Sequence, residues 1–306
     1  MDALSVTVLD TVTDVHGNFL AETATSQPEA VDTVNPTVDY ITTNFADIEN
    51  DGVVSDSDPV VTYTVGFSEP VVPVGAVGSE DISVDGGSLV PESVVLAEDG
   101  LSATFDVTAD DASMAGLTVT ILGTTIADVH GNMFSQPETS DPEVVDTVNP
   151  TVTGIVSSFA DVELDGFVSD SDPVVDYQVS FSEPIPGMGG QDIDVSGGSL
   201  VPGSVVVAEG GMSATFSVEA SNDSMDALSV TVLDTVTDVH GNILATEPTV
   251  IEPVDTVNPE VVAISSNFAD IENDGVVSDS DFIVDYAVGF SEPIPGMGGQ
   301  DIDVSG

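Results

Sequence analysis

The sequence predicts an all-β chain built from tandem β-sandwich domains. Three observations lead to this fold class: a long internal repeat, short runs that alternate apolar and polar residues, and the lack of a helical period in any ten-residue segment. Met1, Met114 and Met225 mark one phase of the repeat, at spacings of 113 and 111 residues. That length suits a sandwich of about seven strands and is far too long for a solenoid repeat.

The second full repeat shows the expected strands most clearly. Residues Ser213 to Val218 read Ser-Ala-Thr-Phe-Ser-Val, in which every second side chain is apolar. Such alternation is typical of a strand with one buried face. Gly, Pro and Asp residues separate the runs. Seven strands are predicted, at 151–157, 174–181, 192–195, 199–207, 213–219, 228–233 and 243–246.

The domain boundaries follow a recurring Asp-Thr-Val-Asn-Pro segment, which begins at Asp32, Asp146 and Asp255. Each copy follows a stretch with Pro and Glu, as linkers often do. The expected division is a C-terminal part of a repeat at 1–33, full repeats at 34–147 and 148–256, and an N-terminal part of a repeat at 257–306.

Both ends of the sequence fall within a repeat. Residues 1–18 recur unchanged as residues 225–242, and the last repeat stops at Gly306. Two interpretations stay open: a stretch of a giant continuous chain, or a short subunit whose two ends exchange strands with other copies.

The composition is extremely acidic. The 306 residues include no Lys or Arg, and the formal net charge is −55. A chain without cationic side chains cannot bind nucleic acid through its phosphates, and an anionic membrane surface repels it. Yet 41% of the residues are hydrophobic and the mean hydropathy is +0.24, which argues against acidic disorder.

Two absences bear on how the fold is stabilised and where it lies. The sequence contains no cysteine, so metal ions are the available cross-link in place of disulfides. No apolar run is long enough to span a bilayer.

A twelve-residue acidic loop at residues 47–58 has the spacing of a calcium-binding loop. Carboxylates stand at the first, third, fifth and twelfth places and glycine at the sixth. Alternate positions of a tight loop direct oxygens inward, and calcium takes six to eight of them. The loop recurs at 161–172 and 270–281 with every acidic position kept. The predicted metal ligands are Asp47, Glu49, Asp51, Val53, Ser55, Asp58, Asp161, Glu163, Asp165, Phe167, Ser169, Asp172, Asp270, Glu272, Asp274, Val276, Ser278 and Asp281, where the residues at place seven lend a backbone carbonyl.

The loop resembles those of EF-hands and, with aspartate at its end, those of dockerins. It departs from the EF-hand pattern in having glutamate at the third place and aspartate instead of a bidentate glutamate at the twelfth. Pro59 and the β-branched run after it predict a strand, so the resemblance covers the loop and not the helix–loop–helix unit. The alternative is a solvated acidic turn whose Asp, Asn and Gly residues serve turn geometry.

Three further motifs resemble the bacterial immunoglobulin-like repeats of giant surface adhesins. They are Phe-Ser-Glu-Pro at 181–184, Asp-Ile-Asp-Val-Ser-Gly-Gly at 192–198 and Thr-Asp-Val-His-Gly-Asn at 237–242. The resemblance runs through every repeat. It implies Ig-like domains in an extended rod, an extracellular or cell-surface stalk of the biofilm-associated type, and stiffening by calcium.

The sequence offers three further kinds of candidate site, most of which favour a structural interpretation. His16, His130 and His240 each lie in an Asp-Val-His-Gly-Asn segment that favours a tight turn over a metal or catalytic site. Asp128, Asn132 and Asp146 are a hypothetical second cation site at a domain junction. The Glu183-Pro184 loop favours a surface turn over a contact between chains, and the lone sequon at Asn222 is discounted.

The favoured function is a structural one: a calcium-stiffened stalk, fibre or matrix filament, not an enzyme, with Ca²⁺ and other copies or neighbouring repeats as partners. The alternative is a cell-surface adhesin whose ligand-binding tip lies outside this stretch. A carbohydrate-binding or hydrolase module is less favoured, because the chain has no Trp for sugar stacking and an enzyme rarely needs three copies of one site.

Overall fold

The computed structural model describes residues 2–73, 80–271, 273–280 and 282–305. In these ranges the regular elements are β-strands, apart from the three-residue 3₁₀-helices η1 (Gly190–Asp192) and η2 (Gly299–Asp301). The predicted all-β class is therefore confirmed. No helix in the described ranges has the length and hydropathy needed to cross a membrane.

The chain divides into two compact units. The first comprises Met1–Thr151 together with two short loops, Glu183–Pro186 and Asp234–Ala245. The second comprises Val152–Ser182, Gly187–Leu233 and Thr246–Gly306.

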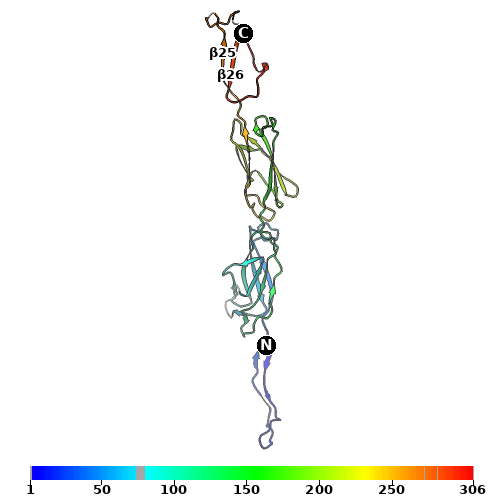
Figure 1. Cartoon of the computed structure of the whole chain (residues 1–306). Helices are drawn as coiled ribbons and strands as arrows, with labels where there is room; N and C mark the ends of the chain where they lie inside the picture. The colour runs from blue at the N-terminus through cyan, green and yellow to red at the C-terminus, as the bar shows by residue number, and fades with distance from the viewer. Residues whose placement is uncertain (1, 74–79, 272, 281, 306) are drawn as a thin grey trace. The chain divides into compact units, whose positions relative to one another are not determined.

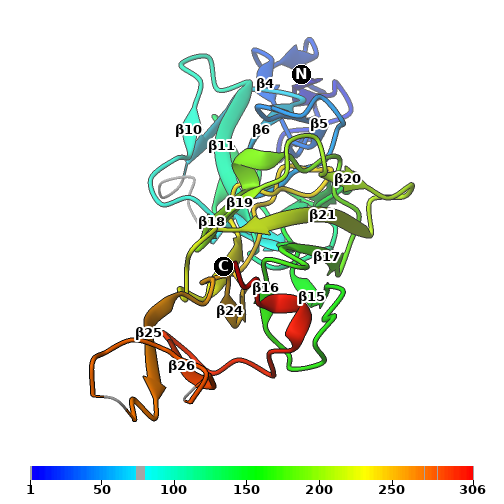
Figure 2. The same cartoon turned by 90° about the horizontal axis from the view of Figure 1, so that it is seen from above.

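The first unit holds a complete sandwich. One sheet has the order β10 (Val95–Leu96), β11 (Ser102–Ala109), β6 (Val60–Phe67) and β5 (Val38–Asn44), and β9 (Gly87–Leu89) also pairs with β11. Figure 2 shows β10, β11, β6 and β5 following one another across this sheet. The pairs are antiparallel, as expected for strands joined by short turns.

A second sheet of the first unit has β12 (Thr118–Ile121) at its centre. The strand pairs with β8 (Ile82–Asp85) on one side and with β14 (Glu138–Thr139) on the other. A separate pair joins β7 (Val71–Pro73) to β13 (Ile126–Asp128). This last pair matters for the site below, because Asp128 ends β13.

The core lies between these sheets and follows the period of two. Along β11 the buried residues are Ala103, Phe105, Val107 and Ala109, and the residues between them are half-buried. Tyr63 of β6 stacks on Phe105 with ring centroids 5.6 Å apart. Burying one such large apolar side chain contributes roughly 1.5–3 kcal/mol. Alternation therefore decides both the register and the inward face of each strand.

The second unit repeats this architecture. Its first sheet has the order β15–β17–β21–β19, with β20 also on β21, and its second has the order β18–β22–β23. Tyr177 and Phe216 repeat the ring stack at 5.3 Å. The strands are β15 (Val152–Ser158), β16 (Val168–Ser169), β17 (Val174–Phe181), β18 (Ile193–Ser196), β19 (Gly198–Leu200), β20 (Val206–Val207), β21 (Ser213–Ala220), β22 (Leu228–Val232), β23 (Thr249–Glu252) and β24 (Val254–Asp255).

Most predicted strands are confirmed, and two predictions were wrong. The predicted strand 199–207 is two strands, β19 and β20, because the turn at Pro202-Gly203 interrupts it, with Gly203 at φ 77°. The predicted strand 243–246 makes one isolated bridge, Thr237 to Ile243, and the strand lies later, at β23. The position of this strand is decided by the pairing of β23 with β22, and not by the apolar run at 243–246.

Each end of the chain carries a smaller strand set. Near the N-terminus, β1 (Asp2–Leu4) pairs with β4 (Glu29–Val31), and β2 (Thr7–Val8) pairs with β3 (Ala24–Thr25). Near the C-terminus, β25 (Val261–Phe268) pairs with β26 (Val284–Phe290), as Figure 1 shows.

Candidate metal centre

The three acidic loops share one backbone conformation. Each lies in the connection that follows the first strand of its repeat, for example between β5 and β6. Positive φ recurs at the first, fourth and sixth places: 46°, 56° and 76° at Asp47, Asn50 and Gly52. The other two loops match, with 43°, 59° and 80° in one and 38°, 58° and 74° in the other. Three copies of the same left-handed positions show that the local sequence determines this turn.

The loop carboxylates accept hydrogen bonds from the loop backbone. Asp47 Oδ1 accepts from the amides of Asp51 (2.9 Å) and Gly52 (3.1 Å), and Asp51 Oδ1 accepts from Val53 N (2.9 Å). The second and third loops make the same three bonds, at 2.9–3.2 Å. Bonds of this kind fix the turn geometry, which is the role that the alternative of an acidic turn gives to these residues.

The last residue of the loop bonds back to earlier loop residues. Asp58, which is 5% exposed, accepts from Ile48 N (2.9 Å), Ser55 N (3.1 Å) and Ser55 Oγ (3.0 Å). Glu49 accepts from Ser57 Oγ at 2.9 Å. The carboxylates at the first, third, fifth and twelfth places therefore each accept a hydrogen bond from a group of the loop itself.

The end of the loop is also paired with the linker. Val54 N donates to Val144 O, and Asp146 N donates to Val54 O, both at 2.9 Å. In the second unit β16 and β24 make the corresponding parallel pair. The loop therefore cannot move without displacing the start of the Asp-Thr-Val-Asn-Pro linker.

The loop carboxylates of the first two copies are not gathered into a close cluster. Among the described residues, the acidic groups whose oxygens lie within 4.8 Å of one another are two triplets, neither of them in a loop. Glu272 and Asp281 of the third loop lie outside the described residues. The eighteen predicted ligands thus remain a prediction, for which the loop backbone supplies a suitable turn.

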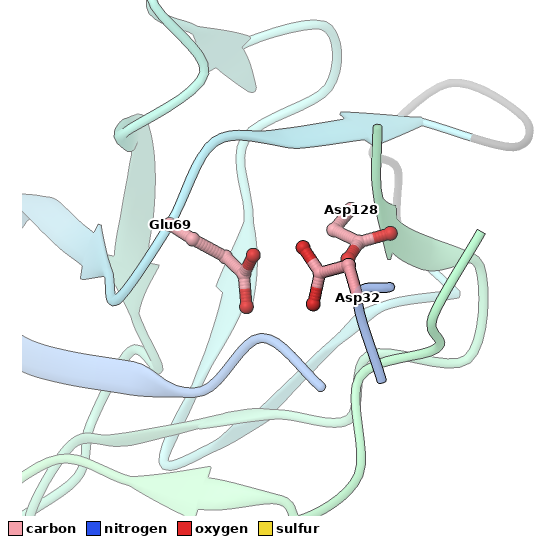
Figure 3. A group of neighbouring side chains, drawn as sticks. All are labelled: Asp32, Glu69 and Asp128. Carbon is pink, nitrogen blue, oxygen red and sulfur yellow. The ribbon is translucent and has the colours of Figure 1, made fainter. Parts of the chain in front are cut away.

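The two acidic triplets are Asp32–Glu69–Asp128, here the first triplet, and Asp146–Glu183–Asp238, the second triplet. Figure 3 shows the Glu69 carboxylate facing those of Asp32 and Asp128. Each triplet combines a linker Asp, the Glu of a Phe-Ser-Glu-Pro segment and the Asp of an Asp-Val-His-Gly-Asn segment. All six residues belong to the first unit.

The hypothetical grouping of Asp128 and Asn132 with Asp146 was wrong. Asp128 instead meets Asp32, the linker aspartate one repeat earlier, while Asp146 meets Asp238. Asn132 does take part: its Nδ2 donates to Asp128 Oδ2 (2.7 Å) and to Asp32 O (3.3 Å). The reason is the chain path, which returns the turn at 128–132 to the linker that enters its repeat and not to the linker that leaves it.

The turn from Asp238 to Asn242 binds both the loop and the linker. Asn242 is fully buried; its Nδ2 donates to Asp146 O (3.0 Å) and Asp238 Oδ2 (2.8 Å), and its Oδ1 accepts from Asp56 N (2.8 Å). Gly241 has φ 86°, which disfavours a side chain, and its backbone lies close to the Glu49 carboxylate. The turn predicted for the histidine segment is present, and it also makes contacts that the sequence did not indicate.

His240 lies beside the second triplet and can carry a positive charge when protonated. Its Nδ1 lies 2.7 Å from Asp51 Oδ2, and its Nε2 lies 4.0 Å from Asp146 Oδ2. Partial burial opposes the charged imidazole, but the hydrogen bond to Asp51 and the charges of Asp51, Asp146 and Asp238 raise the pKa of His240 above its usual value. The same contact helps to lower the pKa of Asp51 despite its desolvation.

In the first triplet, the surroundings of Glu69 and Asp128 shift the pKa values of these two carboxyl groups in opposite directions. Burial and the charges of Asp32 and Asp128 raise the pKa of Glu69, and His130 offsets part of this rise. Asp128 is desolvated, yet the side chain and amide of Asn132 and the amide of His130 lower its pKa. In the first triplet the turn amides therefore favour the charged form of Asp128, whereas the surroundings of Glu69 disfavour its charged form.

Sequence reasoning missed Asp32 and Glu69 as members of the first triplet, and Glu183, Asp238, His240 and Asn242 as residues at the second triplet. A signal was present, since Phe-Ser-Glu-Pro recurs at 67–70, 181–184 and 290–293. The surface turn expected for the Glu183-Pro184 loop does not indicate the triplet, because nothing local shows which residues this glutamate faces.

Among the comparisons with known proteins, only the one with solved structures found similar chains. No family model matches the chain. No curated protein sequence matches it either. Similar solved structures include the N-terminal part of the bacterial S-layer protein SbsC (17% identity, TM-score 0.24, 72% of this chain and 44% of that one) and invasin, a bacterial integrin-binding protein (14%, 0.28, 86% and 62%). The titin Ig tandem domains A164–A165 match at 10% identity and TM-score 0.20, over 72% and 96% of the chains. The chain spans less than half the length of the SbsC structures.

Proposed function

We propose that this chain is a stretch of an extracellular structural repeat protein, a stalk, fibre or matrix filament at the cell surface, and that calcium stiffens it. The observation that carries this proposal is the second triplet, in which one oxygen of each of three carboxylates lies within 4.8 Å of the others, in a chain that has no Lys or Arg. Asp146 and Asp238 are 6% and 2% exposed. Charges taken out of water in this way need a counter-charge.

The size of the repulsion supports a bound cation. At 4.8 Å or less, two carboxylates in an effective dielectric of about 20 repel by roughly 3 kcal/mol or more, and a triplet contains three such pairs. The whole stability of a domain is only about 5–15 kcal/mol. One partly exposed histidine offsets part of this cost, and a divalent oxygen-binding cation offsets more.

Two buried side-chain oxygens that lack a hydrogen-bond partner are also consistent with a bound cation. Within the described residues, Asn149 Oδ1, three positions after Asp146, is buried without a hydrogen-bond partner. In the second unit the same holds for Oε1 of Glu292, the counterpart of Glu69 and Glu183. Carboxylate and amide oxygens are the ligands calcium takes in proteins.

The proposed mechanical role follows from the segments that the second triplet and the acidic loop connect. The second triplet, with Asn242, ties a linker residue to a turn of the following repeat, and the acidic loop is paired with the same linker. A cation held by the triplet or the loop would lock linker, loop and turn together. Repetition of one joint along a chain is what a stalk needs, and no described feature favours the adhesin or hydrolase alternatives over it.

Calcium titration of the isosteric variant Glu183→Gln tests the proposal. The variant removes one charge from the second triplet, so its calcium affinity should fall about tenfold and the calcium-induced rise in Tm should shrink. Glu209→Gln, the same change at an exposed turn, is the control and should behave as wild type. Equal Tm values for the wild type in calcium and in chelator would refute calcium stiffening.

A further inference from the structure

The first strand of the second unit, β15, lies at the edge of its sheet. It spans Val152–Ser158 and pairs with β17 on one side. Among the described residues, no hydrogen bond joins the other side of β15 to another segment. The backbone N–H and C=O groups along this edge are therefore open to a further strand.

β15 differs from the other long edge strands in having no charged residue. Its sequence is Val-Thr-Gly-Ile-Val-Ser-Ser. In the four sheets of the two sandwiches, the other edge strands of four or more residues each contain a carboxylate: Asp39 in β5, Asp85 in β8, Asp194 in β18 and Glu252 in β23. Charged side chains on an edge strand oppose its pairing with another chain. In a chain with 55 acidic residues, β15 thus lacks the protection that these edges have.

The outer face of β15 has a projecting side chain next to an open space. Val156 is 64% exposed. Two positions earlier on the same face, a side chain on Gly154 would meet no atom within 4 Å apart from those of its chain neighbours. Two antiparallel copies of β15 can therefore place the Val156 of each over the Gly154 of the other.

The equivalent strand of the first unit has neither the open space nor the uncharged edge. β5 and β15 match residue for residue, and β5 has Asp39 in place of Thr153 and Tyr40 in place of Gly154. The Tyr40 ring lies over Gly66 of the neighbouring strand β6. The chain therefore contains one edge suited to pairing with itself and one that is not.

We propose that β15 of one copy pairs antiparallel with β15 of a second copy. The register that pairs all seven residues is centred on Ile155, and it sets Val156 opposite Gly154 of the other copy. The same patch serves both partners, so the contact is isologous and joins two sheets into one. A second copy fits because β15 itself supplies both the projecting valine and the space that receives it. Neighbouring chains are linked side by side in this way.

The surroundings of β15 limit the strength of this contact. Each copy has a formal net charge of −55, and the exposed Asp176 lies opposite Ser158, one strand further into the sheet. The two chains therefore repel each other around an uncharged edge. Association should need high protein concentration and should increase with sodium chloride, which screens the repulsion. β15 contributes no carboxylate, so the contact should persist in chelator and does not depend on the proposed calcium sites.

Sedimentation velocity of the whole chain tests the pairing. In chelator and about 1 M sodium chloride, where the screening length is about 3 Å, the dimer fraction should rise with protein concentration up to about 100 µM. Thr153→Asp gives β15 the carboxylate that β5 has at Asp39 and should weaken dimerisation about tenfold or more. The control is Thr215→Asp, which adds the same charge to an exposed position on β21, a strand paired on both sides. It should dimerise as the wild type does.

Single cysteines test the register, because the chain has no cysteine of its own. Ile155→Cys lies opposite itself in the proposed dimer, so on oxidation it should give a product of twice 31.2 kDa on a non-reducing gel. Ser158→Cys lies opposite Val152 and should give much less of it. Random collisions would favour Ser158→Cys, because Ser158 is exposed whereas Ile155 is half-buried.

Three results would each overturn the proposal. They are a wild type that stays monomeric at every concentration, equal weakening by Thr153→Asp and Thr215→Asp, and a stronger cross-link from Ser158→Cys than from Ile155→Cys. Circular dichroism of each variant shows that it keeps its β-rich fold, so that a loss of dimer reports on the edge.

Discussion

Asn242 joins three segments through one side chain, because it bonds Asp56 N, Asp146 O and Asp238 Oδ2 while fully buried. Asn242→Asp keeps the shape but puts an oxygen where Nδ2 donated, next to two acceptors. The expected loss is about 2–4 kcal/mol of unfolding free energy. Chemical denaturation measures it.

Asn18→Asp is the matched control for Asn242. It occupies the same place in the first Asp-Val-His-Gly-Asn segment and is exposed, and its Nδ2 donates to Asp14 Oδ2 (2.9 Å). Its cost should stay under about 1 kcal/mol, because water can solvate the new carboxylate. Similar losses for both variants would show that the turn alone, and not its contacts with loop and linker, is affected.

His240 predicts a dependence of stability on pH in the absence of calcium. Because the pKa of His240 is raised in the folded protein, its contact with Asp51 stabilises fully below the unfolded pKa of 6.5. The stabilisation is lost as pH rises through the higher folded pKa. Relative to His240→Gln, the wild type should gain about 0.5–1 kcal/mol near pH 5.5 and almost nothing near pH 9. A difference that does not vary with pH would contradict the assigned contact.

At the scale of elements, the acidic loop combines a backbone turn with carboxylates that the turn bonds hold in place. If the loop binds calcium, Asp51→Ala removes a ligand at the fifth place and should reduce the calcium-induced rise in Tm. Scanning calorimetry with and without calcium measures this rise.

The control for the loop is Asn50, at the fourth place, which is not a ligand position. It lies at φ 56°, so alanine there would strain the backbone by about 1 kcal/mol whether or not metal is present. Asn50→Gly avoids this strain and should leave the calcium response unchanged. If Asp51→Ala and Asn50→Gly respond alike to calcium, the loop is an acidic turn and the triplets alone are the metal candidates.

At the scale of the whole molecule, the net charge of −55 makes every repeat repel its neighbours. The sandwich cores depend on apolar faces such as that of β11, whereas the proposed joints depend on cations. Chelation should therefore loosen the joints without unfolding the sandwiches. Small-angle scattering should show a changed maximum dimension while far-ultraviolet dichroism stays β-rich. An unchanged scattering profile would show that the linkers are rigid without metal.

Local sequence was sufficient for much of this protein. The alternation in Ser213–Ala220 predicts a strand because its period is read from neighbouring residues. The conformation of the acidic loop is local too, since three copies in two units adopt the same positive-φ positions. The predictions for strands 199–207 and 243–246 failed where a turn or the partner strand decided the pairing.

The triplets show what only the tertiary structure decided. Asp146, Glu183 and Asp238 come from three segments far apart in the chain, and each looks like a turn residue in its own context. Which linker a turn meets depends on the path of the strands between them, and no spacing rule encodes that path. The sequence by itself determined the all-β fold, the repeat and the absence of any Lys or Arg. The folded chain decided which carboxylates are brought together, because only packing takes charges from distant segments out of water and into contact.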